Sequence, residues 1–258
     1  MTALPHSANN IILLRAEDIT PYDHSRGKTE QVREMFDNIA PAYDRLNRAM
    51  SLGLDHSWRR KAVDMVGATK PRTIVDIATG TGDFALSLAR RIPESHIIGL
   101  DLSEGMVGIG RRKVAAAGLA DRIDLQVCDC LASPLPDGIA DAVTVAFGVR
   151  NFADLPAGYA AMMRMLRPGG ILCVIELSTP QSPIIRPFYN LYARHIIPLM
   201  GRLVSKDNRA YSYLPESIAA VPCGERMTAL MEAAGGVDAR FYPLTFGVCT
   251  IYTAFRKK

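Results

Sequence analysis

The chain has 258 residues, of which 48% are apolar, and its formal net charge is +4. This length fits one α/β domain with additions, and the absence of any Lys/Arg block argues against a nucleic-acid partner. The five cysteines form no CxxC pair, so the sequence predicts neither a zinc site nor a disulfide framework, and a reducing cytoplasm fits best.

The N-terminal part divides into a leader and a helical segment. Residues 1–28 mix polar residues with prolines and a glycine, which predicts a flexible leader. From Thr29 onward apolar side chains recur at helical spacing until Pro41 interrupts them, and a second helix is predicted over residues 56–66. We therefore expect residues 29–70 to form an N-terminal helical cap.

From residue 72 onward, strands and helices alternate. Buried strands are predicted over residues 73–78, 96–101, 123–129, 142–148 and 171–177. The helices between them are predicted over residues 83–91, from the N-cap Ser103 to about Ala117, and over 155–166, where Arg167-Pro168-Gly169-Gly170 follows. Strands and helices at this spacing predict right-handed βαβ units and a parallel sheet.

The C-terminal third begins with an insertion over residues 178–213 that is rich in aromatic residues and prolines. The elements predicted after it are a helix over about 224–234 and strands over 237–243 and 249–255. The two strands are close enough in sequence to form an antiparallel pair joined through Gly247. The predicted fold is an α/β Rossmann-like, doubly wound sheet, mostly parallel with a terminal antiparallel pair, in one domain over residues 29–258.

A turn with few side chains follows the first strand, in VDIATGTGDFALSLARR (75–91). Gly80 and Gly82 lie where that strand passes into its helix, at the edge of the sheet where ligands bind. Glycine allows a ligand to approach the backbone and permits positive φ. The second strand ends in Asp101, whose carboxylate is predicted to accept hydrogen bonds from both hydroxyls of a ribose.

Two kinds of ligand compete for this turn. A dinucleotide, and with it an oxidoreductase, requires G-x-G-x-x-G, whereas the spacing here is Ala78-x-Gly80-x-Gly82. Asp83 at the start of the helix would repel a pyrophosphate but not a ligand that carries an amino group and a sulfonium. S-adenosylmethionine (SAM) has both groups and a ribose. A tight structural turn also explains the glycines by themselves.

A further acidic residue closes the third strand. From there Asp129 is placed to accept a hydrogen bond from an adenine amino group, while the backbone N–H of Cys130 meets a ring nitrogen. The alternative is an aspartate that only caps a loop, because Asp favours turns.

Several segments together resemble a known family. They are MFDNIAPAYDRLN (35–47), ATGTGD (78–83), FGVRN (147–151), LRPGG (166–170) and SYLPESI (212–218). The chain resembles class I SAM-dependent methyltransferases and, within them, the demethylmenaquinone/ubiquinone C-methyltransferase family, from about residue 30 to the end. The resemblance implies methylation of a ring carbon of a polyprenylated quinol with SAM and no metal. It also implies that Thr81, Asp101, Asp129 and Cys130 fall on cofactor positions.

The sequence departs from these relatives at two positions. Ala78 stands where the general methyltransferase pattern has glycine, and Ala146 stands where many relatives have a serine near the cofactor. The first is sterically tolerable, and the second removes one hydrogen bond.

The same resemblance indicates where the chemistry occurs. A hydroquinone carbon becomes nucleophilic when the neighbouring hydroxyl loses its proton, so the site needs a route for the proton or a positive group beside the phenolate. Arg150 is expected to supply that charge and Asn151 to orient the phenolate or a water. Tyr43 matches a family position that closes over the site. The alternative is that Arg150 pairs with Asp154 on the surface.

The expected substrate is demethylmenaquinol. The benzoquinol of ubiquinone synthesis, both quinols, another small aromatic or lipid, and a non-catalytic SAM-binding module remain alternatives. The aromatic face of the insertion is either core or a path for the isoprenoid tail. With Arg186, Arg194 and Arg202 it predicts transient contact with the inner face of the membrane. The family often forms dimers, which leaves a homodimer open.

Overall fold

The computed structural model describes residues 15–23, 25–196 and 208–258, and these residues build one mixed sheet. Its strands are β1 (Thr73–Ile77), β2 (His96–Asp101), β3 (Ile123–Val127), β4 (Ala140–Ala146), β5 (Leu166–Leu177), β6 (Gly236–Leu244) and β7 (Cys249–Arg256), in the order β3-β2-β1-β4-β5-β7-β6. β1 to β5 are parallel, and β7 runs antiparallel between β5 and β6. The predicted sheet, with its terminal antiparallel pair, is confirmed.

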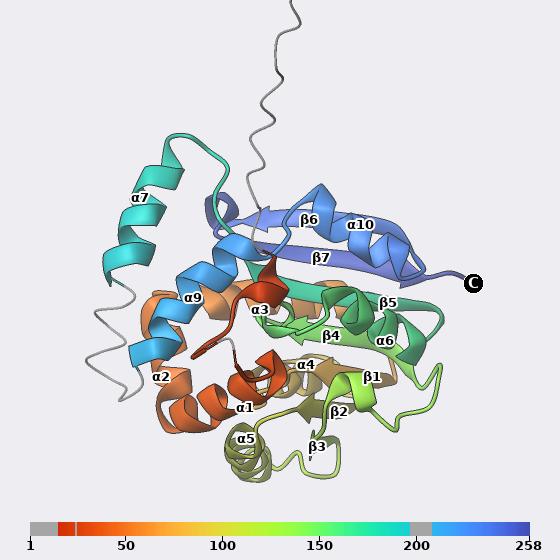
Figure 1. Cartoon of the computed structure of the whole chain (residues 1–258). Coiled ribbons are helices and arrows are strands. Elements are labelled where there is room, and N and C mark those ends of the chain that lie inside the picture. Colours follow the sequence, from red (N-terminus) through yellow and green to blue (C-terminus); the bar gives the residue numbers. More distant parts are fainter. Residues whose placement is uncertain (1–14, 24, 197–207) are drawn as a thin grey trace, which may run out of the picture.

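Helices cover both faces of the sheet (Figure 1). One face carries α3 (Leu54–Gly67), α4 (Asp83–Arg91) and α5 (Glu104–Ala116), and the other carries α6 (Leu155–Met165) and α10 (Glu225–Ala233). Successive side chains of a strand point to opposite faces, so Ile74 of β1 packs in the first core and Val75 in the second. The helix predicted from Ser103 begins as expected, since the Ser103 hydroxyl accepts the Met106 N–H at 3.1 Å.

A third group of helices lies at the edge to which the parallel strands point (Figure 1). It consists of α1 (Lys28–Ile39), α2 (Tyr43–Met50) and α9 (Asn208–Ala220). Met35, Leu46 and Tyr213, one from each helix, share a small core with Met106 of α5. The interruption predicted at Pro41 is a short turn of 3₁₀ helix, Ala40–Ala42, between α1 and α2.

β5 and α9 differ most from the sequence prediction. β5 begins at Leu166, so the Arg167-Pro168-Gly169-Gly170 stretch belongs to the strand; Leu166 pairs with Ala140, and the register shifts before the next pair. α9 runs to Ala220 through Pro215, beyond the predicted end of the insertion. Both features depend on packing partners far away in the sequence, which local turn signals do not report.

The first half of the insertion is helical. It contains α7 (Ile185–Leu191), which continues into a π-helical turn, Tyr192–Ile196. Residues 197–207, with the predicted membrane contact Arg202, lie outside the described residues, as does the side chain of Arg194.

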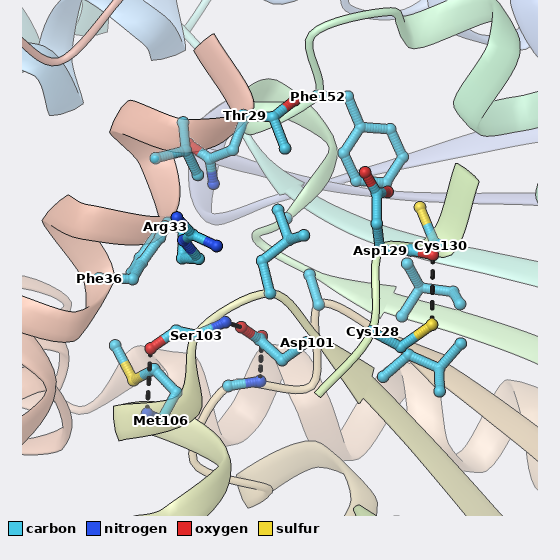
Figure 2. Close-up of a pocket in the computed structure, with 18 of the residues that line it drawn as sticks. Thr29, Arg33, Phe36, Asp101, Ser103, Met106, Cys128, Asp129, Cys130 and Phe152 are labelled. Carbon is cyan, nitrogen blue, oxygen red and sulfur yellow. Dashed lines mark hydrogen bonds between the residues drawn. The ribbon is translucent and has the colours of Figure 1, made fainter. Parts of the chain in front are cut away.

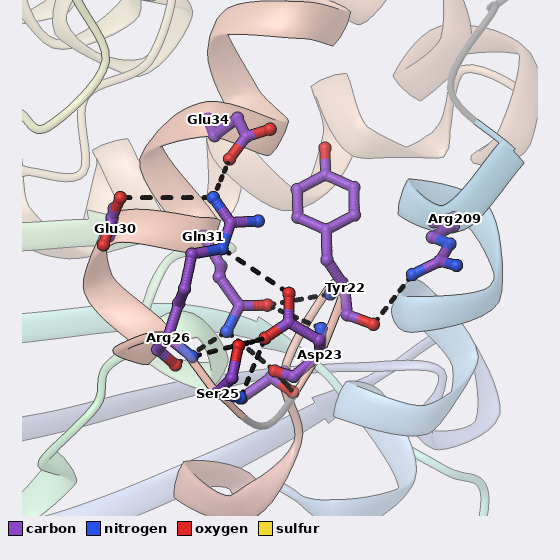
Figure 3. A network of polar contacts seen from close by, with 9 residues as sticks. Tyr22, Asp23, Ser25, Arg26, Glu30, Gln31, Glu34 and Arg209 are labelled. Atoms are coloured by element: carbon purple, nitrogen blue, oxygen red, sulfur yellow. Dashed lines mark hydrogen bonds and ion pairs between the residues drawn. The ribbon is translucent and has the colours of Figure 1, made fainter.

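Gln31 of α1 fastens the segment that precedes it (Figure 3). Its buried amide donates to the carbonyls of Asp23 and Arg26, both at 2.8 Å, and accepts the N–H groups of Tyr22 and Asp23 at 2.9 and 3.0 Å. Arg209 of α9 donates to the Tyr22 carbonyl at 2.9 Å. Residues 15–23 of the expected leader therefore join α1 to α9, and residues 1–14 lie outside the described part.

Candidate functional site

A cavity lined by apolar residues and by the polar side chains of Arg33, Asp101 and Asp129, called the polar cavity below, opens where β1, β2, β3 and β4 end beneath α1. It contains about 790 Å³ of empty space, part of it open to solvent. Figure 2 shows Thr29 and Arg33 of α1 on one side of it, and Asp129 and Cys130 on the other. The predicted site residues that line it are Tyr43, Gly80, Asp101, Asp129, Cys130 and Asn151.

Asp101 supports the turn and faces the cavity at once. Its Oδ2 accepts the Gly80 N–H at 2.7 Å and its Oδ1 accepts the Ser103 N–H at 2.9 Å (Figure 2). Burial raises the pKa of Asp101, although both N–H donors oppose the rise. Each carboxylate oxygen can accept two hydrogen bonds, so both can still accept one from a ligand hydroxyl.

The turn itself uses three left-handed residues. Ala78, Gly80 and Gly82 have φ of +52°, +57° and +77°. At Gly80 the space is open to the ring of Tyr43, which lies 3.9 Å from the position that a Cβ would take. Ala78 carries its side chain in a conformation that favours glycine, and Gly148 makes room for that methyl group, because a Cβ there would lie 2.6 Å from it.

Thr81 and Gly82, predicted to bind the cofactor, do not line this cavity. The Thr81 hydroxyl donates to Asp44 of α2 at 2.6 Å, and Lys113 of α5 bonds to Asp44 at 2.8 Å. Lys113 also forms an ion pair with Asp83. The sequence predicted that Asp83 would repel a pyrophosphate. The structure does not support this argument, because the Asp83 carboxylate is paired with Lys113 and faces α2 and α5.

Asp129 caps a loop, as one of the two alternatives predicted, and also lines the cavity. Its Oδ1 accepts the Leu131 N–H at 2.9 Å and so caps the short turn Cys130–Ala132, while the residue also lines the cavity. Burial raises the pKa of the Cys130 thiol to about 12. Cys130 therefore stays protonated and is not a nucleophile.

A second, mainly apolar cavity adjoins the first. It contains about 1190 Å³ of empty space, part of it open to solvent, and Tyr43 and Phe147 line both cavities. Its wall includes Trp58, Tyr189 and Leu214, which come from α3, α7 and α9. The predicted insertion therefore does contribute to a cavity beside the polar one.

Arg150 lies in the wall of this second cavity. The side chain is buried, and its Nη1 forms an ion pair with Glu176 at 2.8 Å and donates to the Phe147 carbonyl. Burial is the largest influence on the pKa of Arg150 and acts to lower it, but Glu176, Tyr43 and Tyr213 together raise the pKa above its usual value. The alternative of a surface pair with Asp154 is wrong, since that carboxylate caps α6 by accepting the Ala157 N–H at 2.8 Å.

The neighbouring predicted residues are also held in place. Asn151 is buried, and its Oδ1 accepts the Tyr213 hydroxyl of α9 at 3.1 Å. Tyr43 packs edge-on against Phe36, with ring centroids 5.9 Å apart, and burial raises its pKa. Sequence reasoning missed Arg59 and Glu176, which also shape this site. Arg59 stands four residues after Asp55, a spacing that any exposed helical ion pair shares.

Comparison with known proteins matches this architecture to one family. The sequence model of the ubiE/COQ5 methyltransferase family matches residues 24–256. The chain belongs to the ubiE/COQ5 methyltransferase family. It is 48% identical to the demethylmenaquinone methyltransferase of Bacteroides fragilis, over 92% of this chain and 97% of that protein. It is 45% identical to the ubiquinone/menaquinone biosynthesis C-methyltransferase UbiE of Geobacter sulfurreducens, over 88% of both chains.

Solved structures share the fold at lower identity. Mitomycin 7-O-methyltransferase MmcR is 22% identical with a TM-score of 0.60, over 86% of this chain and 60% of that one. A SAM-dependent methyltransferase from Aquifex aeolicus is 18% identical with a TM-score of 0.53, over 71% of this chain and 81% of that one. The fold is thus that of class I methyltransferases, and family membership makes this chain a methyltransferase.

The described residues hold neither a metal-type cluster of side chains nor a helix that could span a membrane. They contain no group of three or more His, Cys, Asp or Glu side chains arranged to hold a metal ion. None of the helices in that part of the chain has the length and apolar character needed to cross a bilayer.

Proposed function

We propose that this enzyme transfers the methyl group of SAM to a ring carbon of demethylmenaquinol. The observation that carries the proposal is the pair of adjoining cavities, one polar and one apolar, with Tyr43 and Phe147 at their boundary. A methyl donor in the first and an aromatic ring in the second would meet between these two side chains. Two relatives named demethylmenaquinone methyltransferase, which match over 97% and 100% of their own length, support the choice of ring.

The residues of the polar cavity fit SAM. Asp101 accepts hydrogen bonds from the ribose hydroxyls. Asp129 accepts a hydrogen bond from the adenine amino group, beside the backbone of Cys130. Gly80 lets the methionine portion lie close to the main chain, where Arg33 supplies a positive charge for its carboxylate. Thr81 and Gly82 act indirectly, by holding the turn in shape. Bound SAM supplies the activated methyl group, and the chemistry requires no metal ion.

Arg150 stabilises the nucleophile. The quinol carbon attacks as its neighbouring oxygen takes on phenolate character, and a guanidinium in a mainly apolar cavity favours that charge. Since the pKa of Arg150 is raised, it stays protonated and is not the base. The pKa of Tyr43 is raised as well, so the phenol also keeps its proton at neutral pH. The new carbon–carbon bond replaces the sulfonium–carbon bond, and the ring hydrogen leaves as a proton through water that Asn151 orients.

The isoprenoid tail leaves through an apolar rim. Leu52 and Phe188 line the second cavity yet are 78% and 70% exposed. Ile184, which precedes α7, and Leu191 of α7 are 73% and 61% exposed. Phe246, in the turn between β6 and β7, is 77% exposed. Such a cluster marks an interaction surface, and a tail that resides in a bilayer makes a lipid surface its partner. The enzyme acts from the cytoplasm, at the inner face of the membrane.

Two variants test the rim. Phe188→Ser with Leu191→Ser should reduce cosedimentation with phosphatidylethanolamine/phosphatidylglycerol vesicles, while Val237→Ser, an exposed apolar position on β6, should not. Equal cosedimentation of all proteins would contradict a lipid-facing rim. If gel filtration instead shows that the rim variant converts a dimer to a monomer, a second copy of the chain covers this surface.

The substrate test uses purified enzyme, SAM and short-chain quinols. Demethylmenaquinol and the demethylated benzoquinol of the ubiquinone pathway are offered separately, because one relative is named for both pathways. Mass spectrometry is expected to show replacement of one ring hydrogen by methyl in the naphthoquinol. Methylation of the benzoquinol alone would change the assigned ring, and methylation of neither would refute the proposal.

A further inference from the structure

A second arginine lies in the apolar cavity and has no part in the chemistry described so far. Arg59 of α3 is 7% exposed and lines the same cavity as Arg150. One of its terminal nitrogens forms an ion pair with Asp55, four residues earlier. Its guanidinium carbon also lies 5.3 Å from the centroid of the Phe147 ring.

Arg59 and Arg150 share an unusual feature. In each, the Nε is buried and has no hydrogen-bond partner among the described residues. A buried donor without a partner is costly, and buried polar groups are normally satisfied. Each Nε lies below the cavity surface, so the guanidinium ends are the parts of these side chains that can meet a ligand. Two guanidinium groups in the wall of one mainly apolar cavity indicate a ligand that is itself largely apolar but carries two acceptor oxygens.

Phe147 fixes how the two arginines are arranged. Arg150 donates to the Phe147 carbonyl, whereas Arg59 lies over the Phe147 ring, so the two guanidinium groups contact different ends of one residue. Both arginines line the apolar cavity and not the polar one, but Asn151, next to Arg150 in the chain, lines the polar cavity. Arg150 is therefore on the side of the methyl donor, and Arg59 is farther along the ring site.

We propose that Arg59 binds the second oxygen of the quinol, the one para to the oxygen beside the methylated carbon. The inference rests on the proposed function, since it assumes a ring with two oxygens in this cavity. Asp55, which also lines the cavity, orients Arg59 through their ion pair, and its carboxylate offers an acceptor for the hydroxyl hydrogen. Arg59 is thus a positioning residue that recognises a 1,4-dihydroxy ring.

The test compares two substrates with two enzymes. The substrates are the short-chain naphthoquinol and an analogue that lacks only the hydroxyl para to the reactive one. The variant is Arg59→Lys, which keeps the charge beside Asp55 but loses the forked guanidinium group. Arg60→Lys, the same change at the exposed neighbouring position of α3, is the matched control.

With the diol, Arg59→Lys should lower kcat/KM by roughly 10- to 100-fold, mainly through KM, because it removes a charged hydrogen bond. With the single-hydroxyl analogue, wild type and variant should agree within about 3-fold, since the contact is missing in both. Arg60→Lys should behave as wild type. Calorimetric affinity for S-adenosylhomocysteine should be unchanged in all three proteins, which shows that the fold is intact.

Each other outcome has a definite meaning. If Arg59→Lys loses the same factor on both substrates, the residue has only a structural role and the inference is wrong. If Arg59→Lys keeps the wild-type kcat/KM with the diol, Arg59 does not contact the ring. If wild type methylates neither quinol, the proposed function fails, and this inference fails with it.

Discussion

Asp101→Asn is the substitution that most directly tests how the polar cavity binds its ligand. In the free enzyme the two carboxylate oxygens accept the N–H groups of Gly80 and Ser103. An amide keeps one acceptor oxygen and replaces the other with a donor, so one of these N–H groups loses its partner. We expect the free protein to be destabilised by about 1–3 kcal/mol, the cost of one unsatisfied buried donor.

The effect on ligand binding adds to this loss. A ribose hydroxyl that donates to a carboxylate contributes about 1.5–3 kcal/mol, as hydrogen bonds to charged groups do. Losing one such bond should raise the Kd for S-adenosylhomocysteine by roughly 10- to 150-fold, at about 1.4 kcal/mol for each factor of ten. Isothermal titration calorimetry measures the Kd, and urea unfolding measures the stability of the free protein.

Asp124→Asn is the matched control, because it makes the same change at an exposed position on β3. It should leave both quantities near their wild-type values. A Kd for S-adenosylhomocysteine that stays within twofold of wild type in Asp101→Asn would refute the ribose assignment. A loss of stability without a loss of affinity would show that Asp101 only supports the turn.

Three further predictions concern the surroundings of the site. Asp44→Ala removes the acceptor for the Thr81 hydroxyl, which holds the glycine turn in shape, and should raise the Kd for S-adenosylhomocysteine about 5-fold, the effect of one hydrogen bond; an unchanged Kd would contradict this role of Thr81. Burial raises the pKa of Asp76 to about 6 from 3.8. The stability that protonated Asp76 contributes is therefore complete below pH 3.8 and falls by about 3 kcal/mol as pH rises through 6. The free energy of urea unfolding of Asp76→Asn should lack this pH dependence, and the same pH dependence in variant and wild type would refute the assignment. Gly148→Ala should lower the free energy of urea unfolding by about 1–3 kcal/mol, because the new methyl group overlaps with Ala78. Adding Ala78→Gly should recover part of this loss, whereas strictly additive effects of the two substitutions in the double variant would contradict the contact.

The sequence by itself determined the sheet and the position of the glycine turn. Alternation of strands and helices is a local pattern, and hydrophobic periodicity within each segment reports which face is buried. The helix over Asp83–Arg91 and the strand over His96–Asp101 accordingly have the predicted bounds. The position of Asp101 beside the glycine turn could also be predicted from this pattern, because neighbouring parallel strands end at the same edge of the sheet.

The tertiary structure decided which polar side chains meet. Thr81 and Asp83 lie in the right motif, yet they bond to Asp44 and Lys113 on helices that no local pattern places beside the turn. Arg59 resembles any exposed arginine in its own helix until Phe147 and the second cavity are built around it. Periodicity depends on neighbours a few residues away, whereas these contacts join residues many positions apart, so only the packing of the whole chain selects them.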